Sequence, residues 1–598
     1  MAPPIEDLAL LSDCRSAALV ARDGTLVWWA APRFDSTSAF AQLLDPDGGH
    51  WSIRPRGRFE SERRYLDGTL VLETTMRAAS GTLRLTDALA FAPGARGHEL
   101  GREVPHALVR TVEALGGDVE IEVELVPRLE YGLAVPRLVA ADGGIATLGG
   151  PERLFLRGDR ELEPDGGSAS ARLTLRAGER AGWVLHRVAG AYAHAPDPID
   201  PHETLADAVQ AWRSWSEMHG GYEGEHAERV RFAGRVVQAL TYQPSGAVVA
   251  AATTSLPEIA DGDANWDYRF AWLRDAAMIA RALSCSTCPD EALRYFDWIV
   301  RAAVSCRHSD EVQIVFGVEG ERDLSEHELS HLAGYDGAAP VRVGNAAWRQ
   351  KQLDVLGHVL DCAWSIRDEL GAPDAFTADF LCQLADRAAK QWRERDSSIW
   401  EGREGERHYT VSKLGCWVAL DRALGLADRL GDRAQPARWR RARSEVRDVL
   451  LREAWHEGRG AFTGALGSDH LDAGVLLLPL SGFVDQRDPR VTSTIEVLER
   501  QLGEDGLLRR WTDAPDGAFL LASFWLAECH ARAGRIERAE AVFERAAACS
   551  NDLGLLSEEV DPSTGAALGN TPQAISHIGL VNAAQALTEA REGQAVGA

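Results

Sequence analysis

The sequence predicts a multi-domain fold, in which an N-terminal antiparallel β-sandwich is followed by an all-α barrel of the (α/α)6 type. Three observations predict it. Residues 1–200 contain short segments of alternating apolar and polar residues, separated by Gly, Pro and Asp. From residue 223 onward apolar residues recur at helical spacing, and the predicted helices form pairs. We therefore assign residues 1–200 to the sandwich, 201–222 to a linker helix and 223–598 to the barrel.

The sandwich prediction follows from the period of two. Strands of an antiparallel sheet that bury one face show this alternation, and turn residues at short intervals join neighbouring strands. The clearest alternating segments are residues 17–20, 25–29, 69–75, 119–126 and 171–175. Residues 201–222 then change to a helical pattern that carries Trp212 and Trp215, so we expect this helix to pack between the two domains.

Twelve helical segments are expected in the barrel region. They begin near Ala227, Trp266, Asp290, Asn345, Ala375, Thr410, Gln435, His470, Arg490, Gly517, Arg535 and Pro572. In several pairs one helix is nearly all apolar, as in residues 518–527, and its partner is amphipathic, as in 535–543. A helix that is apolar on all sides is buried and an amphipathic helix covers it, so the pairs predict an inner and an outer ring. Residues 309–343 form an unusually long connection, which predicts a functional loop.

The net charge of the chain limits the classes of partner that it is expected to bind. A net charge of −26 and a pI near 5.1 argue against binding to nucleic acid or to an anionic membrane. No apolar run reaches the roughly 18 residues of a membrane span, and no signal peptide is visible, so we expect a cytoplasmic protein. A neutral ligand is unaffected by this charge, and a homo-oligomer is compatible with the composition.

Cysteine and histidine patterns predict no metal site. The nine cysteines are sparse and mostly lie in apolar helical contexts, which predicts reduced core thiols. Cys285 and Cys288 form a lone CxxC without a second pair, which favours a loop or helix end over a metal site. His327 and His331 lie four residues apart among glutamates, which favours a solvated helix face.

In residues 265–275 aromatic and charged side chains alternate so closely that no face of a helix formed there could be wholly buried and apolar. Such a segment suits a sugar, whose ring faces stack on aromatics and whose hydroxyls need charged hydrogen-bond partners. The alternative is a helix start capped by Asp267 with a buried ion pair. Residues 398–402, 506–511 and 552–562 also precede apolar, predicted inner helices. Such loops share one mouth of an (α/α)6 barrel, which predicts a concave ligand site there.

Two of these loops carry candidate catalytic carboxyl groups. Glycoside hydrolysis needs one protonated carboxyl that donates to the leaving oxygen and, for inversion, an ionised one that activates water. Glu401 beside Trp400 fits the acid, because an apolar neighbour raises the pKa of a carboxyl group. Glu558 fits the base.

Several stretches together resemble one known family. They are residues 5–36, 253–258, 265–275, 320–324, 399–401 and 556–562. On these stretches the sequence resembles glycoside hydrolase family 15, the glucoamylase-like family, in its bacterial two-domain form, over nearly the whole chain. The resemblance implies a β-sandwich on an (α/α)6 barrel and hydrolysis of α-glucosidic bonds with inversion.

The resemblance also implies roles for single residues. Glu401 matches the general acid, and Glu558 matches the general base, with Glu559 as the register alternative. Trp272 and Arg274, together with Asp275, match the group that holds the non-reducing glucose.

Further matches concern the walls of the site. Tyr268 matches a tyrosine near the reaction centre, and Trp400 matches the tryptophan beside the acid. Arg510 matches a sugar-binding arginine that is followed by an aromatic residue, here Trp511, with Arg509 as the alternative. His577 is expected to be either a core or capping histidine or a sugar contact. Residues 402–406 depart from the family pattern after the acid, which leaves the leaving-group side undetermined.

The resemblance to bacterial two-domain members implies a trehalase acting on a disaccharide, and no cofactor is certain. Some trehalases are reported to need phosphate, and Mg²⁺ is conceivable in that case. Glucoamylase acting on α-1,4 bonds of oligosaccharides and glucodextranase acting on α-1,6 bonds are the alternatives, because all use the same glucose subsite. A sugar phosphorylase and a non-catalytic carbohydrate-binding protein are the hypotheses from other classes.

Overall fold

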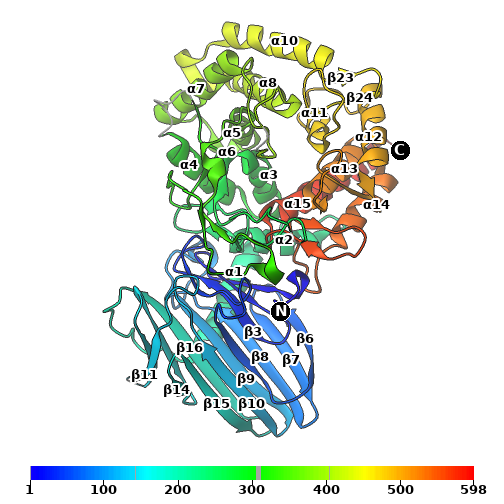
Figure 1. The fold of residues 1–598 in the computed structure, drawn as a ribbon. Helices are drawn as coiled ribbons and strands as arrows, with labels where there is room; N and C mark the ends of the chain where they lie inside the picture. The colour runs from blue at the N-terminus through cyan, green and yellow to red at the C-terminus, as the bar shows by residue number, and fades with distance from the viewer. Residues whose placement is uncertain (1, 142, 261, 305–310, 403–404, 598) are drawn as a thin grey trace.

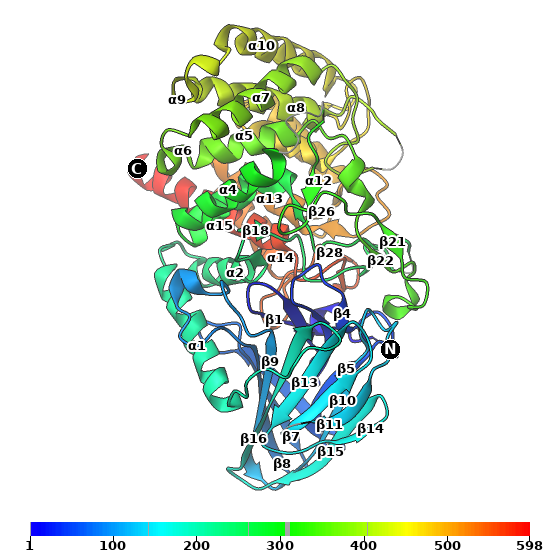
Figure 2. The same cartoon turned by 90° about the vertical axis from the view of Figure 1, so that its left-hand side faces the viewer.

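The computed structural model describes residues 2–141, 143–260, 262–304, 311–402 and 405–597. The β-rich N-terminal part lies at one end of the molecule and the helical part at the other (Figures 1 and 2). The predicted fold class, an antiparallel β-sandwich followed by an (α/α)6 barrel, is confirmed.

Two antiparallel eight-stranded sheets form the sandwich. The first contains β1 (Ala9–Ser12), β2 (Ala17–Val20), β3 (Thr25–Ala30), β4 (Ser38–Phe40), β5 (His50–Pro55), β10 (Val119–Val126), β14 (Glu163–Asp165) and β15 (Ser168–Leu175). The second contains β6 (Phe59–Tyr65), β7 (Leu72–Ala78), β8 (Gly81–Leu89), β9 (Ala107–Gly117), β11 (Arg137–Ala141), β12 (Gly144–Leu148), β13 (Glu152–Gly158) and β16 (Arg180–Ala189). Burial alternates along β10, with Ile121 and Val123 facing the core between the sheets. The alternation of period two in the sequence therefore indicates a strand that buries only one face.

Twelve helices of the described residues form the two rings of the barrel. The inner ring contains α3 (Ala276–Ser286), α5 (Val355–Ser365), α8 (Thr410–Gly425), α11 (Leu477–Leu480), α13 (Leu520–Arg532) and α15 (Ala574–Gly597), and each packs against the next until α15 meets α3. The outer ring contains α2 (Ala227–Ala239), α4 (Pro289–Val304), α7 (Ala375–Gln391), α10 (Pro436–Glu453), α12 (Pro489–Gln501) and α14 (Ile536–Ala547). Short helices α6 (Arg367–Leu370) and α9 (Ala427–Leu430) follow α5 and α8.

Short strands and 3₁₀ turns shape the loops of the barrel. The strands are β17 (Thr241–Tyr242), β18 (Ala247–Val248), β19 (Ala271–Trp272), β20 (Val315–Phe316), β21 (His327–Glu328), β22 (Arg342–Val343), β23 (Trp455–His456), β24 (Ala461–Phe462), β25 (Gly503–Glu504), β26 (Leu507–Leu508), β27 (Ala518–Phe519), β28 (Glu559–Val560) and β29 (Ala567–Leu568). The 3₁₀ turns of the barrel are η3 (Leu273–Asp275), η5 (Tyr335–Gly337), η6 (Ala346–Arg349), η7 (Gly431–Arg433) and η8 (Ala473–Leu476), whereas η1 (Ile5–Asp7) and η2 (Gly97–Glu99) belong to the sandwich region.

Three predicted helix starts are wrong, and all three precede inner helices. The helix expected near Trp266 begins at Ala276, because Ala271 and Trp272 pair with β20 as the extended strand β19. The helix expected near Asn345 begins at Val355, after the turn η6. The segment expected from His470 forms only η8 and the four-residue α11. Polar residues before an inner helix thus belong to the barrel mouth and not to the helix.

Helix α1 (Pro201–Met218) lies beside the sandwich (Figure 2). The side chain of Asp200 caps it by accepting hydrogen bonds from the N–H groups of His202 and Glu203. The helix packs on β8, β9 and β16, while Trp212 and Trp215 are each only 1% exposed in a core cluster that also contains barrel residues.

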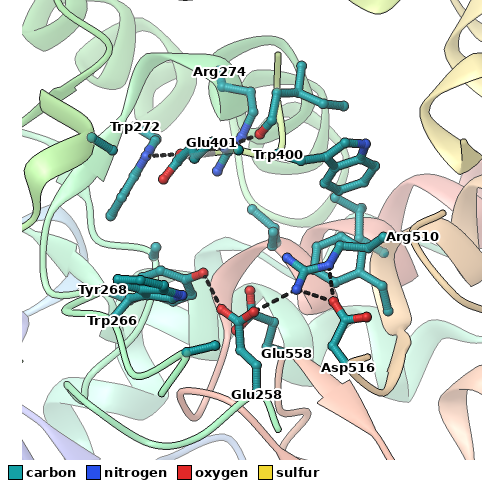
Figure 3. A pocket seen from close by; sticks show the side chains of 18 of the residues that line it. Glu258, Trp266, Tyr268, Trp272, Arg274, Trp400, Glu401, Arg510, Asp516 and Glu558 are labelled. Carbon is teal, nitrogen blue, oxygen red and sulfur yellow. Dashed lines mark hydrogen bonds and ion pairs between the residues drawn. The ribbon is translucent and has the colours of Figure 1, made fainter. Parts of the chain in front are cut away.

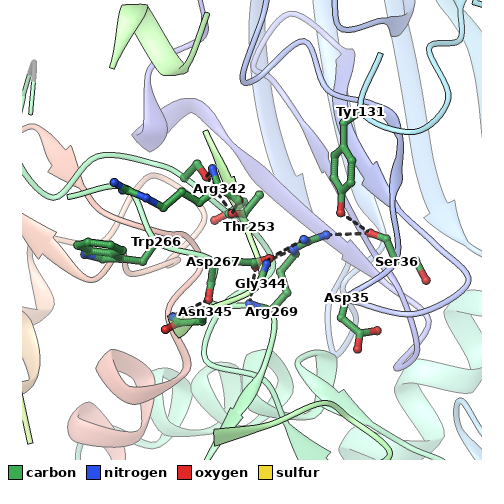
Figure 4. A network of polar contacts seen from close by, with 12 residues as sticks. Asp35, Ser36, Tyr131, Thr253, Trp266, Asp267, Arg269, Arg342, Gly344 and Asn345 are labelled. Atoms are coloured by element: carbon green, nitrogen blue, oxygen red, sulfur yellow. Dashed lines mark hydrogen bonds and ion pairs between the residues drawn. The ribbon is translucent and has the colours of Figure 1, made fainter. Parts of the chain in front are cut away.

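A buried ion pair joins the sandwich to the segment of residues 265–275. Asp267 binds Arg269 through both of its carboxylate oxygens, at 2.8 and 2.7 Å, and Arg269 Nη1 donates to the carbonyl oxygen of Ser36 at 2.8 Å (Figure 4). The hydroxyl of Tyr131 donates to the same carbonyl. The ion pair that the alternative interpretation expected is therefore present, but it anchors a loop and not a helix start.

In the part of the chain that the structure describes, no helix is both long and apolar enough to cross a lipid bilayer.

Candidate active site

A cavity of about 400 Å³ opens where four loops lead into inner helices. Its volume lies in the range of roughly 300–1,000 Å³ that is typical of small-molecule sites. The predicted site residues on its lining are Tyr268, Trp272 and Arg274 before α3, Trp400 and Glu401 before α8, Arg510 and Trp511 before α13, and Glu558 before α15. The prediction that these loops share one mouth is confirmed.

Glu401 lies on one wall, held by two N–H donors. Its Oε1 accepts from Trp272 Nε1 at 2.6 Å and from Arg274 Nη1 at 2.7 Å (Figure 3). Arg274 is itself fixed, because Nη1 also donates to the carbonyl oxygen of Ile399 at 2.8 Å. Burial raises the pKa of the Glu401 carboxyl, and the charge of Arg274 opposes this rise.

The backbone around Glu401 is strained. Ser398 and Glu401 have φ values of +66° and +57°, which side chains with a Cβ atom rarely adopt. The amide of Gln350 donates to the carbonyl oxygen of Glu401 at 3.0 Å, and Trp400 Nε1 donates to Asp472 at 2.9 Å. Such strain costs about 1–3 kcal/mol per residue and persists where the surroundings impose it. These contacts aim the Glu401 carboxyl into the cavity.

Glu558 lies on the opposite wall, beside a group of carboxylates around Arg510 (Figure 3). Arg510 Nη2 binds Glu258 at 2.6 Å and Glu559 at 3.1 Å, and its Nε donates to Asp516 at 2.6 Å. Burial and then the charge of Glu258 raise the pKa of Glu558 well above its usual value, while Arg510 lowers it.

Tyr268 connects this wall to the aromatic side of the cavity. Its hydroxyl donates to Glu258 Oε1 at 2.9 Å, and its ring meets Trp272 edge to face at 5.5 Å between centroids. Burial and the neighbouring carboxylates raise the pKa of Tyr268, so the phenol stays protonated and acts as a donor. Trp400 and Trp511 face the cavity from the other side, 6.1 Å apart between centroids.

The structure distinguishes the members of the two pairs that the sequence left open, Glu558 or Glu559 and Arg510 or Arg509. Glu558 lines the cavity, whereas Glu559 is 0% exposed and accepts from the N–H of Gly517 at 2.8 Å. Arg510 lines the cavity, whereas Arg509 turns outward to Glu504 at 2.8 Å. The cavity therefore receives Glu558 and Arg510.

Two predicted sugar contacts lie behind the cavity lining. His577 is 1% exposed, and its Nε2 accepts from the N–H of Leu556 at 3.1 Å, so it supports the loop that carries Glu558. Its burial and this hydrogen bond fit the core alternative for His577, and a direct contact of His577 with sugar stays a prediction. Asp275 is 3% exposed and accepts from Arg274 Nε at 3.1 Å. It orients Arg274, and its own contact with sugar stays a prediction.

The carboxylates around Arg510 do not fit a divalent cation. Oxygens of Glu258, Asp516 and Glu559 lie close enough together to hold one, but the Arg510 guanidinium already occupies the space between them. These three described carboxylates therefore offer no pre-formed Mg²⁺ site.

Two other predictions concern loops near the mouth. His327 lies in strand β21 and His331 Nε2 bonds to the carbonyl oxygen of Tyr131 at 2.9 Å, so the expected helix face is wrong. Arg403 and Glu404, in the stretch that departs from the family pattern, lie outside the described residues.

Among the lining residues that sequence reasoning missed are Glu258, Trp266 and Arg342. Glu258 ends one of the matched stretches, and Trp266 lies in the aromatic segment, so both carried a signal that was not used. Arg342 lies over the ring of Trp266, 4.6 Å from its centroid, and donates to the carbonyl oxygen of Asp263 at 2.7 Å. It ends the long connection, where no local pattern marks it.

Comparison with known proteins agrees with this geometry. The family model for glycosyl hydrolases family 15 matches residues 233–585, and that for the trehalase-like N-terminal domain matches residues 1–212. A trehalase from Mycolicibacterium smegmatis is 35% identical over 99% of this chain and 92% of its own length. A trehalase from Thermoplasma volcanium is 29% identical over 98% of this chain and 94% of its own length.

The fold has a solved counterpart. A bacterial glucoamylase in complex with acarbose superimposes with a TM-score of 0.73, covering 98% of this chain and 96% of that one at 13% identity. At this identity the likeness concerns the fold, and it includes both the sandwich and the barrel.

Proposed function

Because the chain belongs to glycosyl hydrolase family 15 and is a glycosidase, we propose that it hydrolyses α,α-trehalose to two molecules of glucose with inversion. One observation carries the chemistry: Glu401 and Glu558 face one aromatic-lined cavity from opposite walls. Similarity to trehalases over nearly the full length of the chain supports the choice of trehalose.

Glu401 acts as the general acid in this proposal. Both N–H donors reach its Oε1, so a proton on this carboxyl resides on Oε2, the oxygen left to meet the substrate. As the bond between C1 and the bridging oxygen breaks, Oε2 transfers its proton to that oxygen and the second glucose leaves. The resulting carboxylate is then stabilised by Arg274 and Trp272.

Glu558 acts as the general base. It takes a proton from a water molecule whose oxygen bonds to C1 on the face opposite to the leaving glucose, so the configuration at C1 inverts. This step requires the two carboxyl groups to stand roughly 6.5–9.5 Å apart, with room for the water. Each turnover consumes one water molecule. Its hydroxyl group bonds to C1 and its proton goes to Glu558, while the proton of Glu401 goes to the leaving glucose.

Other lining residues are assigned to the two sugar rings of the substrate. We assign Tyr268 and Trp272 to the sugar ring, Arg274 and Arg510 to hydroxyl groups, and Trp400 with Trp511 to the side where the second glucose leaves. Rings and guanidinium groups on this lining supply the stacking faces and N–H donors that a hexose requires.

The configuration of the released glucose tests the proposal directly. Inverting hydrolysis of α,α-trehalose releases one α-glucose as leaving group and one β-glucose from the attacked ring, in equal amounts before mutarotation. Nuclear magnetic resonance during the first turnovers should show this ratio. Release of two α-glucose molecules would contradict the inverting mechanism. If the protein hydrolysed maltose or isomaltose but not trehalose, the assignment of trehalose as substrate would be wrong.

The same assay covers the alternatives. Maltose reports glucoamylase activity, isomaltose reports cleavage of α-1,6 bonds, and glucose 1-phosphate formed in the presence of phosphate reports a phosphorylase. Phosphate and Mg²⁺ are each added to and omitted from the trehalose reaction. Cell fractionation and light scattering test the cytoplasmic location and the homo-oligomer, which stay predictions.

A further inference from the structure

A cluster of two histidines and one cysteine lies at the junction of three parts of the chain, away from the active-site cavity. His98 belongs to η2 of the sandwich, His219 follows α1, and Cys288 directly precedes α4 of the barrel. One ring nitrogen of each histidine and the Cys288 Sγ all lie within 4.8 Å of one another. This donor set is one that Zn²⁺ prefers.

His219 offers a buried nitrogen without a partner. The residue is 3% exposed, and its Nδ1 donates to the carbonyl oxygen of Trp215 at 2.6 Å. Its Nε2 is buried and makes no hydrogen bond with any described residue. An orphaned buried nitrogen costs free energy unless something binds it. Because Nδ1 carries the proton of that hydrogen bond, Nε2 carries the lone pair of the neutral ring.

His98 has the support that metal-binding histidines usually have. Its Nδ1 lies 2.9 Å from Glu291 Oε1, and Glu291 is 3% exposed. A carboxylate on one ring nitrogen orients the imidazole and makes the other nitrogen a better ligand. The two rings stand edge to face, 5.5 Å apart between centroids. Because both Nδ1 atoms contact other groups, Nε2 of each ring is left for a shared ion.

Cys288 lies at the N-terminal end of α4. It precedes Pro289, the first residue of that helix, and the N–H of Glu291 donates to its carbonyl oxygen at 3.2 Å. Burial raises the pKa of the Cys288 thiol, and the backbone N–H groups at the start of the helix oppose this rise. A helix N-terminus stabilises a thiolate. Cys285 points elsewhere, to Gln585 Oε1 at 3.3 Å, so the CxxC does not act as a pair.

We propose that His98, His219 and Cys288 bind a Zn²⁺ ion that clamps the sandwich, α1 and the barrel together. A thiolate and two imidazoles favour Zn²⁺ over Mg²⁺ or Ca²⁺, which prefer oxygen ligands. Water completes the tetrahedron, because His98 and Cys288 are only half-buried. No residue of this site lines the active-site cavity as described, so the ion stabilises the joint and takes no part in hydrolysis.

Titration of EDTA-treated protein with Co²⁺, a coloured substitute for Zn²⁺, tests the ligands. The wild type should bind one equivalent, with a thiolate-to-cobalt charge-transfer band and the intense visible bands of tetrahedral Co²⁺. Cys288→Ser should lose the charge-transfer band, whereas the matched control Cys285→Ser should keep it. Absence of the band from the wild type, or its loss in Cys285→Ser only, would overturn the proposal.

Affinity and stability provide a second measurement that does not depend on colour. Glu291→Gln retains all three ligands but should weaken Zn²⁺ binding about 10–100-fold, because it removes the carboxylate behind His98. Zn²⁺ should raise the Tm of the wild type and of Cys285→Ser, but not that of Cys288→Ser. An equal rise in all three proteins, or none in the wild type, would contradict a site built on Cys288.

Discussion

Glu401 and Glu558 face the same cavity from surroundings of different charge. Glu401 is a single carboxyl group that meets one guanidinium and one indole N–H. Glu558 belongs to a group of four described carboxyls, with Glu258, Asp516 and Glu559, that surrounds the single guanidinium of Arg510. On one wall two carboxyls, Glu401 and Asp275, share the guanidinium of Arg274, whereas on the other wall four carboxyls share one guanidinium.

This difference shows that the two walls handle protons in different ways. Burial raises the pKa of both carboxyls, so the direction of the shift does not by itself separate acid from base. Four buried carboxyls cannot all be ionised around one arginine, and such a group titrates as a unit. Glu558 must be ionised to act as the base, so a proton that this group of carboxyls retains has to reside on one of the other carboxyls. Glu559, whose pKa burial also raises, is suited to hold it.

The largest expected effect is that of Glu558→Gln. Removing the base should lower kcat about 10²–10⁴-fold, on trehalose and equally on α-glucosyl fluoride, because both need an activated water. Steady-state assays on both substrates measure this loss. The comparison variant is Glu559→Gln, which alters the next carboxyl without touching the cavity lining. A larger loss in Glu559→Gln would reverse the register assignment.

Glu401→Gln should remove a similar factor, about 10²–10⁴ in kcat, on trehalose only. Fluoride leaves without protonation, so hydrolysis of α-glucosyl fluoride should be largely retained. The same pair of substrates therefore distinguishes the general acid from the general base. Glu401 would not be the acid if the variant hydrolysed trehalose normally, or if it lost both substrates while remaining folded by circular dichroism.

Trp272→Phe tests the wall that carries Glu401 with a smaller change. The ring stays, but the N–H that bonds Glu401 Oε1 at 2.6 Å is lost, which should lower kcat roughly tenfold. That N–H stabilises the carboxylate, so its removal raises the pKa of Glu401 further. Activity that falls as pH rises through this pKa should persist to higher pH, moving the alkaline limb of kcat/KM upward.

Trp439→Phe is the matched control for Trp272→Phe. It removes an indole N–H that donates to Asp386 at 2.9 Å on the outer ring, away from the cavity. Its pH profile should coincide with that of the wild type. An alkaline limb that moves downward in Trp272→Phe would contradict the role of this hydrogen bond.

Glu258→Gln tests the acid-rich wall and should give the smallest change in rate at neutral pH. The negative charge of Glu258 raises the pKa of Glu558, so its removal lowers that pKa. Activity is lost as pH falls through the pKa of the base, and the acid limb of kcat/KM should therefore move to lower pH. Glu528→Gln, at a buried carboxylate paired with Arg532 at the other end of α13, should leave this limb unchanged.

Local patterns were sufficient for much of the fold. Alternation along residues 119–126 and the apolar run of residues 518–527 both gave the correct element, because burial of one face or of all faces is written into neighbouring residues. The errors before α3, α5 and α11 arise where polar and aromatic residues serve the cavity. There the contacts are with distant loops, as when Leu273 N–H donates to the carbonyl oxygen of Ile314.

The choice between Glu558 and Glu559 shows the same limit within the site. Strand β28 begins at Glu559 and pairs with β27, so neighbouring side chains point to opposite faces. Which face meets the cavity depends on the register with Phe519, and no local pattern contains that register. The two arginines after β26 were ambiguous for the same reason.

The sequence by itself determined the fold class, the four loops at the mouth and the two candidate carboxyls, since each depends on neighbouring residues or on matched stretches. Only the tertiary structure decided which carboxyls share Arg510, since Glu258 and Arg510 are 252 positions apart, and that His98 meets Glu291 across 193 positions. Both clusters form because the rings of the barrel close and the sandwich docks on them, so that distant charges and ring nitrogens share one buried space.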